Sequence, residues 1–152
     1  MEKNRLEITR LSNRFGFGPK PGEFSANLKA GLKKTQSKLL AIPEIDTGFN
    51  NIKDPTLSDL GPRPKPNSAG VIDFAVARRN QQADLTLWWL DRMVLGNYGL
   101  KEKMTWFWHG HWATSINKVD FPLVMYKQNQ TLRTNSLGNF KTMSRAMVND
   151  GA

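Results

Sequence analysis

Two apolar patterns with the spacing of a helix, separated by a short glycine turn, constrain the fold of this chain more than any other feature. In the first pattern, large side chains recur every three or four residues, at Leu85, Trp88, Trp89 and Met93. A turn at residues 96–99 follows, and the second pattern then runs through Leu100, Met104, Phe107, Trp108, His111 and Trp112. Because such intervals place side chains on one face of a helix, the sequence predicts two helices that pack as an antiparallel pair.

Four weaker patterns predict further helices. The first helix ends near residue 15, because Gly16 and Gly18 tolerate positive φ and Pro19 disfavours helix at the residue before it. A second helix is expected over about residues 21–40. A third begins near Pro122, whose fixed φ suits the first turn of a helix, and runs to Leu137. The break at residues 138–139 then precedes a last helix that begins at Phe140.

Residues 41–71 hold five of the chain's eight prolines and show no sustained apolar period. Proline removes a backbone donor and restricts the residue before it, so a long proline-rich loop is expected over residues 41–71, laid over the helices. We therefore expect a mainly α fold class, an irregular multi-helix bundle, and expect the bundle to be incomplete as given. Residues 1–152 form either a single helical domain or the amino-terminal part of a larger helical domain.

Composition excludes several classes of function. Without cysteine the chain has no disulfide, thiolate metal site or thiol nucleophile. No stretch approaches the roughly 18 apolar residues that a transmembrane helix needs, and no signal-peptide core follows the first residues. These features predict a cytoplasmic location by default.

The net charge of +9 lies mainly at the two ends of the chain. Residues 1–40 carry nine basic and three acidic side chains, and residues 121–152 carry four and one. The basic residues of the first segment follow helical intervals, as on the solvated face of an amphipathic helix. Most aromatic residues lie outside the basic segments, so a groove for stacking single-stranded nucleic acid is not evident. Nucleic acid is therefore only a minor candidate partner.

The chain's two histidines, His109 and His111, lie in the aromatic block at residues 106–112 (WFWHGHW). On a strand the two side chains would share a face and could hold one metal ion. On a helix they point about 200° apart and cannot chelate together. Helical periodicity places His111 toward the core with Phe107 and Trp108, and His109 on the side of Thr105, Trp112 and Ala113.

Both histidines are candidate catalytic or metal-ligating residues, because imidazole titrates near neutral pH and is a common metal ligand. A divalent metal site needs three or four ligands. The others would be carboxylates such as Asp91, Glu102 or Asp120, or would come from beyond Ala152. The alternative is that one histidine is a hydrogen-bonded core residue and the other is half exposed.

Four polar residues near the block in sequence are candidate binding residues: Asn117, Lys118, Asn129 and Arg133. Each also has a plainer interpretation as a helix cap, a loop hydrogen-bonding group or part of a solvated helix surface.

The block and its surroundings resemble the bacterial family known as domain of unknown function 1800. The similar segments are residues 103–115 (KMTWFWHGHWATS) with Lys118 and Val119, residues 14–19 (RFGFGP), residues 88–90 (WWL) with Met93, residues 128–130 (QNQ), Leu132 with Arg133, and residues 137–140 (LGNF). The resemblance implies that the chain is a fragment, continued in longer relatives by a further helical segment, and that export is an alternative location. It implies no mechanism.

Two classes of function follow, and whether the chain is an enzyme stays open between them. The first is an enzyme with a metal- or His-dependent site, completed by the carboxyl-terminal part absent from this sequence. The second is a non-catalytic helical module that binds a protein or polymer partner, with the aromatic block as its core.

Overall fold

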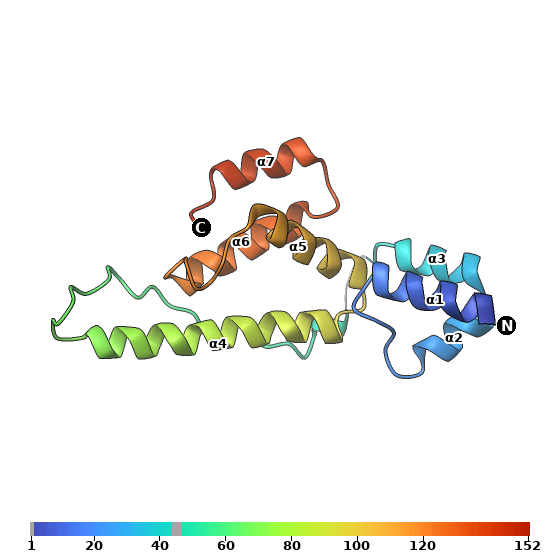
Figure 1. Cartoon of the computed structure of the whole chain (residues 1–152), viewed down its shortest axis with the longest axis horizontal. Helices are drawn as coiled ribbons and strands as arrows, with labels where there is room; N and C mark the ends of the chain where they lie inside the picture. Colours follow the sequence, from blue (N-terminus) through green and yellow to red (C-terminus); the bar gives the residue numbers. More distant parts are fainter. Residues whose placement is uncertain (1, 44–46) are drawn as a thin grey trace. The chain divides into compact units, whose positions relative to one another are not determined.

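The computed structural model describes residues 2–43 and 47–152 (Figure 1). These residues form seven α helices and one short 3-10 helix and contain no strand, which confirms the mainly α prediction. They fall into two compact units. The first comprises the described residues up to Ile52 together with Asp91–Met104, and the second comprises Lys53–Leu90 and Thr105–Ala152. None of the helices described is both long and apolar enough to cross a membrane.

The first unit is built on three short helices that contact one another, α1 (Glu2–Arg14), α2 (Glu23–Ala30) and α3 (Leu32–Leu40), drawn in blue to cyan in Figure 1. The 3-10 helix η1 (Thr47–Phe49) follows them. The single helix expected over residues 21–40 is wrong, because Gly31 adopts φ 84° and ψ 166° and divides it. Glycine reaches such a conformation at low cost, so the chain turns there.

The second unit contains most of α4 (Val71–Leu95), the end of α5 (Gly99–Trp112), α6 (Pro122–Asn135) and α7 (Phe140–Val148). Its buried apolar side chains come from α4, α6 and α7: Leu85, Trp88, Met125, Leu132 and Met143. Helices α6 and α7 pack against each other. Asn139 separates them as expected, because its side-chain oxygen accepts hydrogen bonds from the first amides of α7.

Helices α4 and α5 were expected to pack as an antiparallel pair. In the second unit their backbones do not pack closely along their length, and α6 and α7 make the extended helix contact instead. Side chains join α4 to α5 there, where the rings of Trp89 and His109 meet edge to face with centroids 5.1 Å apart. In this unit α4 and α5 therefore meet through side chains, with Trp89 against His109, rather than through closely packed backbones.

The proline-rich segment before α4 is irregular between η1 and Gly70 and is tied to the second unit by two sets of polar contacts. Gln81 of α4 accepts a hydrogen bond from the Ser58 amide (3.3 Å) and donates one to the Ser58 hydroxyl (2.9 Å). Arg63 pairs with one oxygen of Asp120 at 2.9 Å, and Arg78 of α4 pairs with the other. Asp120 thus links the segment to α4 just before α6 begins.

Burial differences between leucines of the second unit give a direct test of this core. Leu132 is fully buried and Leu87 is 60% exposed, so Leu132→Ala should lower the free energy of unfolding by about 2–5 kcal/mol. The matched variant Leu87→Ala should change it by no more than about 0.5 kcal/mol. Urea unfolding followed by tryptophan fluorescence measures both, because all five tryptophans lie in the second unit. Equal losses in the two variants would contradict this assignment of the core.

Candidate functional site

A cavity of about 250 Å³ in the second unit lies beside His109. Three helices and the turn after α5 contribute its walls: Leu85, Thr86 and Trp89 from α4, His109 from α5, Thr114, Ser115 and Ile116 from the turn, and Met125 and Asn129 from α6. Its lining is thus largely apolar, with a few polar groups around one imidazole. Small-molecule sites commonly combine these properties.

The turn after α5 brings hydroxyl groups to the cavity. Ala113 has φ 52°, a left-handed conformation that ends a helix, and its amide donates to the His109 carbonyl at 3.2 Å. Gln82 of α4 then donates to the Ile116 carbonyl at 3.0 Å, and the Thr114 hydroxyl donates to Gln128 of α6. These contacts hold the turn against both helices, so Thr114 and Ser115 have defined positions at the cavity.

His109 is half-buried and its ring packs against Trp89 at an interplanar angle of 84°. Burial lowers the pKa of His109 below its ordinary value of 6.5, because a low-dielectric surrounding disfavours the charged imidazolium. The ring is therefore neutral at pH 7, with one nitrogen as donor and the other as acceptor. No side chain in the described ranges forms a hydrogen bond with this ring, so both nitrogens are available to a ligand.

His111 lies on the other side of α5 and is exposed, so its predicted place toward the core is wrong. Its ring stacks on Phe107 with centroids 6.3 Å apart and meets Trp108 edge to face at 5.5 Å. Phe107 itself is 51% exposed, whereas Thr105 is fully buried. At the end of α5, the inward side is the one that carries Thr105 and His109, which are four residues apart. The assumption that aromatic residues mark the buried side does not identify it.

A shallower recess of about 340 Å³ lies on the outer side of the block and is lined by Trp106, Phe107, His109, Gly110 and His111. Space around Gly110 is open, since an added Cβ there would meet no atom within 4 Å. Both histidines border this recess, but only His109 also lines the inner cavity.

The structure brings Asn129, among the four predicted binding residues, to the cavity wall. Arg133 lies one helical turn further along α6 and donates to the Asn129 side-chain oxygen at 2.8 Å. Its guanidinium also lies over the Trp88 ring, 5.3 Å from the centroid. Asn117 and Lys118 are exposed in the turn before α6 and do not line the cavity.

Sequence reasoning predicted Asn129 but missed Met125 of α6 and the cavity residues that α4 supplies. The spacing of these residues gave a partial signal. Leu85 and Trp89 are four residues apart and so share one face of α4, and Met125 and Asn129 likewise share one face of α6. Nothing in the sequence indicates that these two faces meet around His109.

The expected carboxylate ligands are not gathered at the histidines in the second unit. Asp120, the candidate in the same unit, is paired with Arg63 and Arg78. Glu102 pairs with Arg92 at 3.4 Å within the first unit, to which Asp91 also belongs. Over the residues that the structure covers, no three His, Asp or Glu side chains are grouped so that they could hold a metal ion.

Among comparisons of the chain with known proteins, only the comparison with protein families gives a match. Neither the curated proteins nor the solved structures include a match. Residues 10–152 match a family described as "Protein of unknown function (DUF1800)", and this range includes the aromatic block, the turn after it and α6. The chain therefore belongs to the DUF1800 family.

Proposed function

We propose that the cavity beside His109 binds a small, largely apolar molecule and that His109 acts on it as a general acid or base. The observation that carries this proposal is the position of His109, a half-buried imidazole on the wall of a 250 Å³ cavity. A neutral imidazole near pH 7 accepts a proton from a bound hydroxyl or water and later returns it. His111, on the outer side of α5, has no part in this step.

The remaining polar groups of the cavity suit the orientation of such a ligand. The amide of Asn129 has its oxygen engaged by Arg133, which fixes the side chain on the cavity wall. The hydroxyls of Thr114 and Ser115 come from a turn that is tied to two helices. Positioned neutral donors and acceptors of this kind give specificity to an apolar pocket. Asn129 therefore binds the ligand, and Arg133 acts by positioning Asn129.

A metal-assisted form of the site keeps His109 as its one imidazole ligand. Oxygen atoms of Thr114, Ser115 and Asn129 are the neighbouring donors in the cavity. Zinc prefers nitrogen, sulfur and carboxylate ligands, so this form requires further ligands from another part of the protein. We therefore place the metal-free acid–base role first.

A non-catalytic binding module is the second candidate, favoured by the outer recess. Trp106 and Phe107 are each 51% exposed there, and exposed aromatic side chains are enriched where proteins bind partners. In this case a protein or polymer partner contacts the outer side of α5, and His109 serves the packing of the second unit.

Ligand binding in matched histidine variants separates these roles. Phenol combines an apolar ring with one hydroxyl, and it should shift the NMR signals of His109 and Trp89. His109→Gln should weaken phenol binding about fivefold, the effect of losing one hydrogen bond of about 1 kcal/mol. The control His111→Gln, two residues away on the other side of α5, should leave binding unchanged.

Equal weakening by both variants, or phenol signals confined to Trp106 and Phe107, would contradict the inner site and support the outer recess. Zinc retained by the wild type and lost only in His109→Gln would instead establish the metal-assisted form.

The pH dependence of stability tests the burial of His109. Because its pKa is lowered in the folded chain, the unfolded chain binds this proton more readily. The contribution of His109 to stability is therefore fully present above about pH 6.5 and is lost as pH falls from that value through the folded pKa. Urea unfolding between pH 8 and pH 5 should show wild type losing stability relative to His109→Gln on acidification. A difference that is constant or rises toward acid pH would be inconsistent with a buried imidazole.

A further inference from the structure

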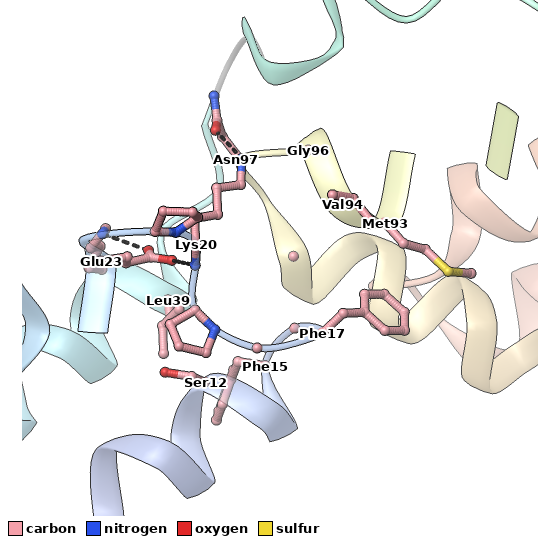
Figure 2. Close-up of a pocket in the computed structure, with 16 residues that line it drawn as sticks. Ser12, Phe15, Phe17, Lys20, Glu23, Leu39, Met93, Val94, Gly96 and Asn97 are labelled. Carbon is pink, nitrogen blue, oxygen red and sulfur yellow. Dashed lines mark hydrogen bonds and ion pairs between the residues drawn. The ribbon is translucent and has the colours of Figure 1, made fainter. Parts of the chain in front are cut away.

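A second cavity, of about 400 Å³, lies within the first unit and is separate from the His109 site (Figure 2). The turn at residues 15–21 forms one wall, and the end of α4 with the turn after it forms the other. The lining is completed by side chains of α1, α2 and α3, namely Ser12, Glu23, Lys38 and Leu39. Its volume lies in the range of typical small-molecule sites.

Fixed contacts hold the two walls together. An added Cβ on Gly99 would lie 3.1 Å from the Gly16 Cα, so the two turns approach each other through their backbones. The Lys20 ammonium donates to the Leu95 carbonyl at 2.6 Å and to the Asn97 side-chain oxygen at 2.8 Å. A cation at the carboxyl end of a helix is favoured by the helix dipole. Lys20 therefore ties the first wall to the end of α4, and the cavity is preformed.

The charged groups that line this cavity leave an excess of one positive charge. They are Lys20, Lys38 and Glu23. The two oxygens of Glu23 accept hydrogen bonds from the Lys20 amide (3.0 Å) and the Lys38 ammonium (2.9 Å). Burial raises the pKa of Glu23, but these hydrogen bonds and the two lysine charges bring it below its ordinary 4.5. Glu23 is thus ionised at neutral pH.

The two lysine ammonium groups keep N–H groups that can donate hydrogen bonds to a ligand. Each ammonium has three N–H groups. Lys38 donates one of them to Glu23, and Lys20 donates two to the Leu95 carbonyl and the Asn97 side-chain oxygen. Both Glu23 oxygens are already engaged. A ligand that supplies acceptors and one negative charge therefore complements these groups.

Apart from Ser12 and Asn97, the other side chains of the lining are aromatic, aliphatic or thioether groups. Figure 2 shows Phe17 extending from its turn toward Met93 and Val94, and Phe15 lying near Ser12. An inorganic anion would leave these surfaces in contact with water. A ligand with an apolar body would cover them, at a gain of roughly 25 cal/mol for each Å² removed from water.

We propose that this cavity binds a small organic anion, namely a monocarboxylate with a short apolar body. Lys20 and Lys38 hold the carboxylate, and the apolar body lies against the phenylalanines, Leu39 and Met93. This site is independent of His109, since its lining residues all belong to the first unit.

Calorimetric titration with benzoate tests the proposal in the full chain. Benzoate should bind at least tenfold more tightly than benzyl alcohol, which has the same ring without the charge. Lys20→Met and Lys38→Met should each weaken benzoate binding about tenfold or more. Lys33→Met, which removes the same charge from α3 outside the cavity, is the matched control and should leave binding unchanged.

Equal weakening in Lys33→Met, or displacement of benzoate by inorganic phosphate at the same concentration, would overturn the proposal and assign binding to diffuse attraction by the basic surface. If Lys20→Met loses its helical circular dichroism signal, it is unfolded, and the proposal is then tested by comparing benzoate binding in Lys38→Met and Lys33→Met. His109→Gln should bind benzoate as the wild type does, so failure at this site leaves the His109 proposal standing, and the reverse holds as well.

Discussion

The edge-to-face contact between Trp89 and His109 determines which side of the aromatic block faces inward. An α helix turns about 100° with each residue, so an inward His109 leaves His111 on the outer side with Phe107. The contact, with ring centroids 5.1 Å apart, also joins α4 to α5 in the second unit where the backbones do not pack closely. The space that remains between side chains is the His109 cavity, and its walls depend on this orientation.

Helix α6 supports that arrangement with buried polar groups. Gln128, Asn129 and Arg133 are each at most 5% exposed, and buried polar groups need hydrogen-bond partners. Gln128 accepts from Thr114 of the turn after α5, and Asn129 accepts from Arg133. The Trp108 indole donates to the Ser136 carbonyl at the end of α6, at 3.0 Å. These bonds have directions, so they fix α6 relative to the end of α5 more specifically than apolar packing does.

Local patterns in the sequence predict most of the helices and part of the site. The breaks around Gly16, Pro122 and Asn139 follow from glycine, proline and capping chemistry, which act over a few residues. Gly31 was missed because apolar spacing continues across it and glycine does not always end a helix. The wrong side was assigned to His111 because aromatic residues were expected to be buried, whereas half of Phe107 is exposed and Thr105 is buried. Contacts such as Lys20 with Asn97, 77 residues apart, leave no local signal.

The nuclear Overhauser effects of the two imidazole rings test the central claim, that His109 and not His111 faces the inner cavity. The chain has only two histidines, so one variant assigns both sets of signals. The structure predicts cross-peaks from the His109 ring protons to the Trp89 indole, and from the His111 ring protons to Phe107. Cross-peaks from His111 to Trp89, with none from His109, would contradict the orientation of α5 and the site built on it.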